Sequence, residues 1–370
     1  MNKNSAQASD SWLEKPVFSN LEVSWEMLLF GLIILLAVVS RFYDLGARVI
    51  SHDETSHVYY AWRLFRGMGY SHDPITHGPF QFHFLALIYF LFGDGDFTAR
   101  IPAALCSVAT ILFLWKYRRY LGKWGTLAAS AMTLISPFML YYGRYVRNEA
   151  FVALFGVITL WAILRYLETN RPRYLYWLTA ATMLHFTAKE TAFIYTAQAM
   201  IFLGLAYIYN LSQGRWENPR YRSIFFSTLI LAGVLLGIGF AVQAASPAPP
   251  EGSPEAMSPP VTLLLPLALS GAALLLALYS SVRGYTWKKL KRMPSFSAML
   301  LLGTLVLPQL APFPARMIGW NPLDYTQTGM LQTGLLVALL ALVAIAIGLV
   351  WNPREWLINA AIFYIPFTIF

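Results

Sequence analysis

The stretch FQFHFLALIYFLF, residues 80–92, decides how the chain crosses a membrane. It is apolar, but it has only 13 residues, whereas a membrane-spanning helix needs about 20. It also carries His83 and is followed by Gly-Asp-Gly-Asp at residues 93–96. We therefore expect a helix that lies at the membrane interface without crossing the bilayer.

The composition of the whole chain indicates a membrane protein. Of the 370 residues, 57% are hydrophobic and 12% are charged, whereas about a quarter of the residues in a soluble domain are charged. Candidate membrane-spanning helices are expected at residues 26–43, 99–116, 125–142, 149–166, 174–188, 191–210, 223–244, 260–282, 295–311, 329–350 and 356–370. The predicted fold class is an all-α, polytopic transmembrane bundle of about eleven spans.

The basic residues test this topology, because short cytoplasmic loops carry an excess of lysine and arginine. With the amino-terminal tail, residues 1–25, in the cytoplasm, the inner loops hold Lys116, Arg118, Arg119, Lys123, Arg165, Arg171, Arg173, Arg215, Arg220, Arg222, Arg283, Lys288, Lys289, Lys291, Arg292 and Arg354. These are sixteen of the 27 basic residues. Topology accounts for the net charge of +9, and we expect no nucleic-acid partner.

The first outer loop, residues 44–98, concentrates histidines around two adjacent carboxylates. It contains SHDE at residues 51–54, SHDP at 71–74 and THGP at 76–79. One carboxylate of such a pair can accept a proton from an incoming hydroxyl or amine, while the other holds a metal ion or orients the first. A solvated polar loop would explain the pair alone, but the surrounding histidines favour a site.

A second polar cluster, RYVRNE at residues 144–149, lies at the outer junction of the third and fourth spans. A carboxylate inside a membrane is costly unless it is paired or hydrated, so Glu149 should face the bundle or an aqueous cavity. It either binds a metal ion or closes the helix end through an ion pair with an arginine. Arg144 and Arg147 are candidates to neutralise a phosphate through paired hydrogen bonds.

A third cluster, Lys189-Glu190, separates the fifth and sixth spans on the same outer face. Lys189 is either a point-charge contact to a phosphate or half of a solvated turn. Each cluster by itself has a plain structural explanation. Their meeting at one membrane surface is the functional signal.

Residues 26–210 resemble the membrane-embedded C-type glycosyltransferases, a superfamily that includes protein O-mannosyltransferases and lipid A aminoarabinose transferases. The motifs that carry the resemblance are His52-Asp53-Glu54, His77-Gly78-Pro79, Arg147-Asn148-Glu149 and Ala188-Lys189-Glu190. They are most similar to the flippase-activity-associated glycosyltransferase-like branch. Two features depart from the aminoarabinose transferases: residues 77–79 stand in place of Glu-Lys-Pro, and no arginine closely follows the Asp-Glu pair.

The resemblance implies transfer of a sugar from a polyprenyl-phosphate carrier to an acceptor at the outer face of the cytoplasmic membrane, with inversion at the anomeric carbon. It implies catalytic roles for Asp53, as the base, and for the adjacent Glu54. A divalent cation (Mg, Mn or Zn) is expected at Glu149, with Asp53 and His52 as further ligands. The expected substrate-binding residues are Arg144, Arg147, Lys189 and His77. The expected partners are the carrier lipid and other subunits of a membrane complex.

Two other functions stay open. A non-enzymatic membrane-complex subunit or lipid-flipping accessory would keep the fold without transferring sugar. A secondary transporter would need ionisable residues near mid-membrane, where His185 is the one deep candidate, and a packing role explains it more simply. Residues 26–210 form the expected glycosyltransferase module and residues 211–370 add further transmembrane helices. Because residues 360–370 are apolar to the last residue, we expect the chain to be part of a longer protein.

Overall fold

The computed structural model describes residues 13, 16–18, 21–70, 77–245 and 261–369, and helices dominate this part of the chain. The elements are β1 (Pro16–Phe18), β2 (Leu21–Ser24), α1 (Trp25–Phe42), α2 (His52–Phe65), α3 (Phe80–Phe92), α4 (Asp96–Phe113), η3 (Leu114–Tyr117), α5 (Arg118–Ile135), α6 (Pro137–Tyr142), α7 (Glu149–Thr169), α8 (Arg173–Ala188), α9 (Ala192–Gln213), α10 (Pro219–Ala245), α11 (Val261–Tyr285), α12 (Trp287–Leu290), α13 (Pro294–Val306), η5 (Leu307–Leu310), α14 (Pro312–Met317), α15 (Gln327–Trp351) and α16 (Pro353–Ile369). The antiparallel pair β1–β2 precedes the first helix. The all-α class is confirmed.

Seven helical segments in the described part of the chain are long and apolar enough to cross a membrane, which confirms a polytopic architecture. The expected count of eleven stays a prediction. The difference has two sources: residues 96–135 count as one segment of 40 residues, and α8, α13 and α16 have 16, 13 and 17 residues. At about 1.5 Å per residue, such helices fall short of the roughly 30 Å hydrocarbon layer.

The expected continuous span over residues 125–142 is broken at Ser136. Its ψ of 122° takes the chain out of the helix, because the ring of Pro137 disfavours a helical conformation in the residue before it. The Ser136 hydroxyl then accepts a hydrogen bond from the Met139 N–H at 3.4 Å and caps α6. The short helix α6 leads into the loop of residues 143–148.

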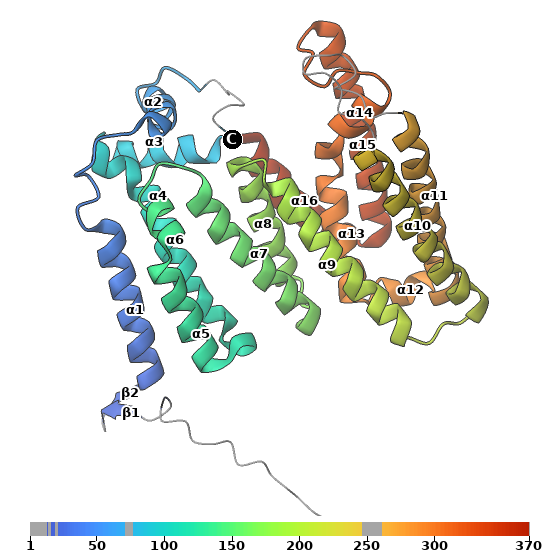
Figure 1. Ribbon diagram of the computed structural model, residues 1–370, viewed down its shortest axis with the longest axis horizontal. Coiled ribbons are helices and arrows are strands. Elements are labelled where there is room, and N and C mark those ends of the chain that lie inside the picture. The colour runs from blue at the N-terminus through green and yellow to red at the C-terminus, as the bar shows by residue number, and fades with distance from the viewer. Residues whose placement is uncertain (1–12, 14–15, 19–20, 71–76, 246–260, 370) are drawn as a thin grey trace, which may run out of the picture. The chain divides into compact units, whose positions relative to one another are not determined.

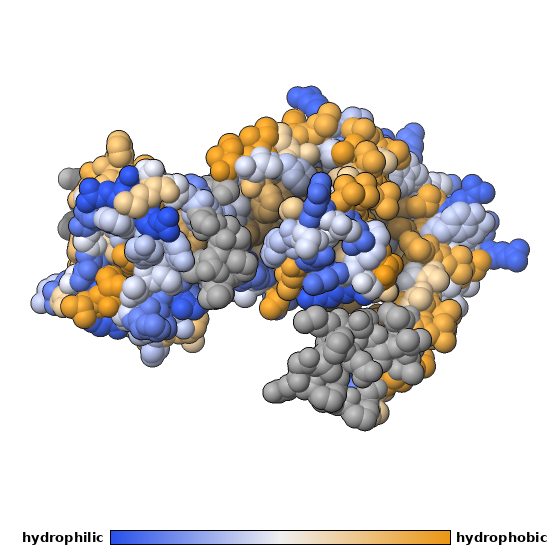
Figure 2. Space-filling view, turned by 90° about the horizontal axis from the view of Figure 1, so that it is seen from above, coloured by the Kyte–Doolittle hydropathy of each residue, from blue (hydrophilic) through white to orange (hydrophobic). Residues whose placement is uncertain are grey.

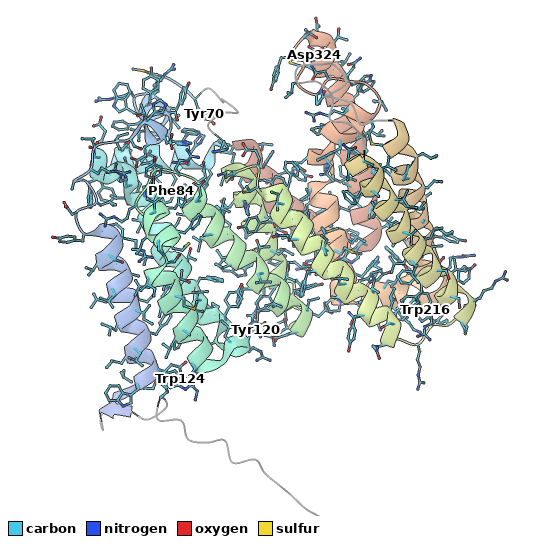
Figure 3. All side chains as sticks on the ribbon, viewed as in Figure 1. Tyr70, Phe84, Tyr120, Trp124, Trp216 and Asp324 are labelled. Atoms are coloured by element: carbon cyan, nitrogen blue, oxygen red, sulfur yellow. The ribbon has the colours of Figure 1, made fainter. Side chains whose placement is uncertain are left out.

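The chain divides into two compact units, residues 1–196 with 362–370, and residues 197–361. In the first unit, α3 runs across the ends of longer helices, beside α2 and far from β1 and β2 (Figure 1). The surface over α2 and α3 is rich in hydrophilic residues (Figure 2). Aromatic side chains mark both ends of this unit, Tyr70 near α2 and Trp124 at the opposite end (Figure 3), as expected at two membrane interfaces.

Two apolar clusters fix α2 and α3 to the rest of the first unit. Ala61 of α2 and Phe82 of α3 pack with Ala99 of α4 and with Val146. Phe151 of α7 and Ala188 belong to the adjacent cluster, which also includes the free, buried Cys106. The loop of residues 143–148 and the end of α8 are therefore held beside α2 and α3.

The second unit contains the hairpin of α10 and α11. The Ser270 hydroxyl donates to the Ala232 carbonyl at 3.0 Å, and both groups are buried. The Tyr207–Ser281 hydrogen bond at 2.7 Å ties α9 to α11 in the same way. The expected domain limits, 26–210 and 211–370, stay a prediction.

Candidate active site

In the first turn of α2, the adjacent carboxylates of Asp53 and Glu54 point in different directions. Ser51 is the N-cap, and its backbone N–H donates to the Glu54 carboxylate at 3.0 Å, which forms a capping box. The Glu54 side chain is completely buried, whereas Asp53 is exposed. Residues one apart lie about 100° apart around a helix, so the cap that buries one carboxylate leaves the other facing outward.

Glu54 is held by a network that joins α2, α4 and the loop of residues 143–148. Arg100 donates to both Glu54 oxygens at 2.9 Å, and the Val146 N–H donates to Oε1 at 3.0 Å. Arg48 adds a contact at 3.3 Å. Burial alone would raise the pKa of Glu54, but hydrogen bonds from Arg100, Ser51 and Val146 outweigh burial and lower this pKa to about 2.

This network changes the role that we give to Glu54. We expected it to be catalytic, yet its oxygens accept hydrogen bonds from the protein and its side chain has no exposed surface. Arg100 was not identified from the sequence. All five of its N–H groups donate hydrogen bonds, to Glu54 and to the carbonyls of residues 45, 48 and 49. In this arrangement Glu54 anchors the first turn of α2, and its catalytic role stays a prediction.

Asp53 lines a cavity of about 440 Å³, which we call the aspartate cavity. The other lining residues are His52, Thr55, Ser56, His57, Tyr59, Tyr60, His77 and Arg147. Four expected site residues therefore share one cavity: Asp53, His52, His77 and Arg147. Among the described residues that line it, Asp53 supplies the one carboxylate.

Behind the aspartate cavity, three charged side chains form a chain of contacts. Lys189 donates to the Glu149 Oε1 at 2.7 Å, and the Arg147 Nε lies 3.9 Å from the Glu149 Oε2. Each of these side chains is between 16% and 26% exposed. Because Arg147 also lines the cavity, it places the partly buried Glu149–Lys189 pair next to the cavity that Asp53 lines.

The segment of residues 77–79 docks directly on the segment of residues 188–190. The Gly78 N–H donates to the Ala188 carbonyl at 3.1 Å, and the His77 Nδ1 donates to Glu190 at 2.9 Å. A Cβ at Gly78 would lie 2.1 Å from the Thr187 carbonyl oxygen, so only glycine allows this approach. Two of the motifs identified in the sequence are thus in contact. Residues 71–76, with the histidine and aspartate of SHDP, lie outside the described residues.

Several buried polar atoms at this site have no hydrogen-bond partner within the described part of the chain. They are the His57 Nδ1, the Arg147 Nε, both amide atoms of Asn148 and the Glu149 Oε2. Buried polar groups in folded proteins are nearly always paired with protein or water. Their concentration beside the aspartate cavity is typical of a site that binds a polar molecule.

His57 is the site residue that sequence reasoning passed over. Burial, followed by the positive charges of Arg147 and His77, lowers the pKa of His57 to about 4, so its imidazole is neutral near pH 7. Residues four apart lie on the same face of a helix. The spacing of Asp53 and His57 was the available signal, once residues 52–65 were recognised as helical.

Arg144 lies away from the aspartate cavity. Its guanidinium donates to the carbonyls of Ser40 and Tyr43 at 2.8 Å and of Asp44 at 3.3 Å, at the end of α1. It lines a second cavity, of about 380 Å³. The structure therefore separates Arg144 from Arg147, although only two residues lie between them.

The expected metal ligands were tested against their contacts. His52 and Asp53 line the aspartate cavity, but the Glu149 Oε1 already accepts a hydrogen bond from Lys189. Within the described ranges, no three His, Cys, Asp or Glu side chains gather as ligands for a metal ion. The arrangement of Glu149 does not fit the expected metal site, because Lys189 takes the place of a cation beside its carboxylate.

Comparison with known proteins supports the resemblance. Residues 76–236 match the family model described as dolichyl-phosphate-mannose-protein mannosyltransferase. The match confirms the superfamily and indicates a glycosyltransferase, while the flippase-associated branch stays a prediction. It contains His77, Arg147, Glu149 and Lys189 but begins after Asp53. No curated protein matches the chain.

Proposed function

We propose that this chain transfers a sugar from a polyprenyl-phosphate carrier to an acceptor, with inversion at the anomeric carbon and with Asp53 as the base. The observation that carries the proposal is the aspartate cavity, where an exposed carboxylate lies in the same cavity as Arg147. The family match supports a lipid-linked mannose as the donor.

In the proposed reaction, the Asp53 carboxylate accepts the proton of the acceptor's hydroxyl or amine. The freed electron pair attacks the anomeric carbon, and the bond from that carbon to the carrier phosphate oxygen breaks. The leaving phosphate keeps the bonding electrons. Arg147 and Lys189 stabilise its charge, because preorganised donors in a water-poor site stabilise charge that develops during reaction.

The different environments of the two adjacent carboxylates, buried for Glu54 and exposed for Asp53, support this mechanism. Glu54 is buried and ionised, and its contacts hold the first turn of α2. Asp53 therefore projects from a fixed turn and needs no reordering when the substrate arrives. The neutral His57 one helical turn away adds no positive charge that would weaken a base.

A reconstituted reaction tests the proposal. The full chain in proteoliposomes is supplied with radiolabelled polyprenyl-phosphate mannose and a panel of lipid and peptide acceptors. We expect Asp53→Asn to lower transfer by about 10²- to 10⁴-fold, the usual contribution of a general base. The matched control is Asp94→Asn, which changes an exposed aspartate of the same unit outside the cavity.

Transfer that persists in Asp53→Asn would refute the role of Asp53. A wild-type chain that binds the carrier without transferring its sugar to any acceptor would instead support a non-enzymatic subunit or a lipid-flipping accessory.

We also propose that the amino terminus is cytoplasmic and the aspartate cavity faces outward. Within the first unit, α2 lies at the end opposite β1 and β2 (Figure 1), and the basic residues from Lys116 to Lys123 are expected inside. The single cysteine, Cys106, is buried. Maleimide labelling of an introduced cysteine should therefore exceed the labelling of the natural chain. We expect a membrane-impermeant maleimide to label Met68→Cys in intact cells but Leu121→Cys only after lysis; the reverse pattern would overturn the orientation.

A further inference from the structure

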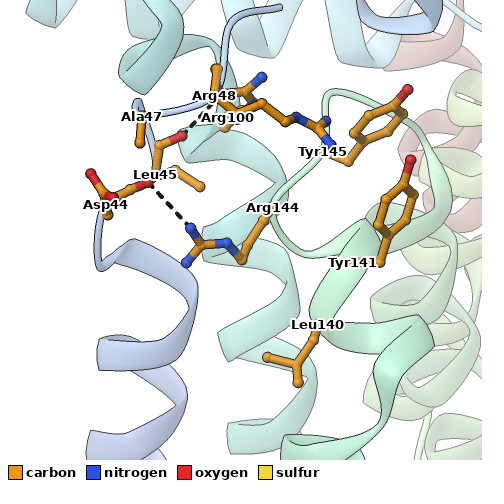
Figure 4. Close-up of a pocket in the computed structure, with 9 residues that line it drawn as sticks. All are labelled: Asp44, Leu45, Ala47, Arg48, Arg100, Leu140, Tyr141, Arg144 and Tyr145. Carbon is orange, nitrogen blue, oxygen red and sulfur yellow. Dashed lines mark hydrogen bonds between the residues drawn. The ribbon is translucent and has the colours of Figure 1, made fainter. Parts of the chain in front are cut away.

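A second cavity in the first unit, of about 380 Å³, lies between the end of α1, α4 and the loop after α6. We call it the arginine cavity; its polar lining consists of Asp44, Arg48, Arg100, Tyr141, Arg144 and Tyr145 (Figure 4). None of these residues lines the aspartate cavity. Tyr145 of this lining forms a hydrogen bond of 2.7 Å with Ser51, which directly precedes His52 and Asp53 of the aspartate cavity.

Two of the arginines, Arg48 and Arg144, have N–H groups that make no hydrogen bond within the described residues. Arg48 donates one hydrogen bond, to Glu54, and its guanidinium lies over the Tyr145 ring at 5.2 Å. Arg144 donates to three backbone carbonyls through its two terminal nitrogens. Within the described residues, the remaining N–H groups of these two side chains have no protein acceptor. Guanidinium groups with spare donors bind phosphate through paired hydrogen bonds.

A fully buried arginine adds uncompensated charge beside this cavity. Arg41 has no exposed surface, and its hydrogen-bond acceptors in the described part of the chain are hydroxyls and carbonyls, including Ser40 at 2.8 Å and the Leu134 carbonyl at 2.9 Å. Ser40 brings it near Arg144, because the Ser40 hydroxyl accepts a hydrogen bond from Arg41 and the Ser40 carbonyl accepts one from Arg144, each at 2.8 Å. A buried charge is costly unless an opposite charge compensates it.

The charges around the cavity do not balance. Three guanidinium groups, from Arg48, Arg100 and Arg144, line the cavity, against the carboxylate of Asp44 in the lining and that of Glu54, which pairs with Arg48 and Arg100. The excess is one positive charge. Such a concave, partly desolvated positive surface attracts anions.

We propose that the arginine cavity binds the phosphate group of an anionic ligand, separately from the substrate in the aspartate cavity. Apolar side chains beside the lining residues favour a membrane lipid as the source of that phosphate. Tyr43 and Val49 are 75% and 76% exposed, next to Asp44 and Arg48 in sequence. They provide the surface that acyl chains would contact, while Arg48 and Arg144 hold the headgroup.

Lipid retention by the full chain tests the proposal without any sugar donor, so its outcome is independent of the transfer reaction. The chain is released from nanodiscs of phosphatidylcholine and phosphatidylglycerol, and native mass spectrometry counts the lipids that remain bound. We expect selective retention of phosphatidylglycerol. Arg48→Gln and Arg144→Gln should each weaken it about tenfold, the effect of losing one charge-assisted hydrogen bond.

Arg66→Gln is a closely matched control. Arg66 is 51% exposed and Arg48 is 54% exposed; each makes one ion pair and lies over an aromatic ring. Arg66 does not line the cavity, so retention should be unchanged. Equal losses in Arg48→Gln and Arg66→Gln would mean a nonspecific charge effect and would overturn the proposal.

Inorganic phosphate identifies the source of the bound group. If millimolar phosphate binds by calorimetry while phosphatidylglycerol is not retained, the ligand is a free phosphate; if the lipid is retained, it is a headgroup. Binding of neither probe would refute the cavity's role. Should Arg144→Gln fail to fold, Arg48→Gln still decides the question, because Glu54 keeps its bonds to Arg100.

Discussion

Replacing Arg100 by methionine tests whether the buried carboxylate network holds the first turn of α2. Arg100 and Glu54 are 1% and 0% exposed, and two hydrogen bonds of 2.9 Å join them. The substitution leaves a buried carboxylate with two backbone N–H groups and the half-exposed Arg48 as partners. Removing one partner from a buried ion pair costs about 3 to 5 kcal/mol.

That cost should appear as a large change in thermal stability. For a unit of about 200 residues, each kcal/mol shifts the Tm by about 2 to 4 °C, so we expect the Tm of Arg100→Met to fall by roughly 10 °C. The measurement is tryptophan fluorescence of the purified full chain on heating, in one detergent. Arg66→Met breaks an exposed ion pair with Asp94 and should change the Tm by less than about 2 °C.

A double variant separates the ion pair from packing in general. Replacing both partners of a buried ion pair by apolar groups of similar volume is often nearly neutral. Glu54→Leu combined with Arg100→Met should therefore recover at least half of the Tm lost in Arg100→Met, because neighbouring sites couple. If the Tm decrease of the double variant equals the sum of those of the two single variants, then Arg100 does not contribute through its pairing with Glu54. That result would refute this explanation.

Four other perturbations follow from the site. Gly78→Ala forces a Cβ against the Thr187 carbonyl and should cost about 1 to 3 kcal/mol by thermal unfolding, whereas Gly31→Ala, with open space around it, should not. Burial and neighbouring positive charge keep the pKa of His57 at about 4 against 6.5 when exposed; the unfolded chain therefore takes up the proton first, and acidification from pH 7 to 4.5 should cost about 2 kcal/mol. His57→Gln should show a smaller acid loss, and an equal loss would contradict this. Lys189→Met removes the nearer of the two cations beside the partly buried Glu149, at 2.7 Å against 3.9 Å for Arg147, so transfer should fall about tenfold or more with retained carrier binding. Because Lys189 already supplies the cation there, EDTA should leave transfer within about twofold, and a loss restored by Mg or Mn would reverse that expectation.

Helices could be predicted from the sequence where a short stretch of residues alone sets their limits. The helix expected at residues 80–92 has the same limits in the structure, because its apolar run ends at a glycine that the chain needs at φ 81°. The break at Ser136 was missed, although Pro137 was visible, because an apolar stretch of 18 residues suggested an uninterrupted span. The prediction gave more weight to the length of the apolar stretch than to Pro137, which changes only the ψ angle of Ser136.

The sequence placed several site residues together, while their roles stay a prediction. Asp53, Arg147 and His77 line one cavity, since each lies near the end of an element at the same end of the first unit. The contacts of Glu54 and Arg144 depend on long-range partners. Arg100, which binds Glu54, lies 46 residues away in the chain, and sequence motifs do not reveal such pairings.

The single turn of chain at Ser51 separates two chambers of different chemistry, and this has a pharmacological consequence. The Ser51 hydroxyl lies 2.7 Å from the hydroxyl of Tyr145, which lines the arginine cavity, while the next two residues, His52 and Asp53, line the aspartate cavity. A small anionic compound bound among the arginines would be recognised by its charge and would need no likeness to a sugar. Any effect of such a compound on transfer would have to pass through residues 48–52, which join the two cavities in the chain.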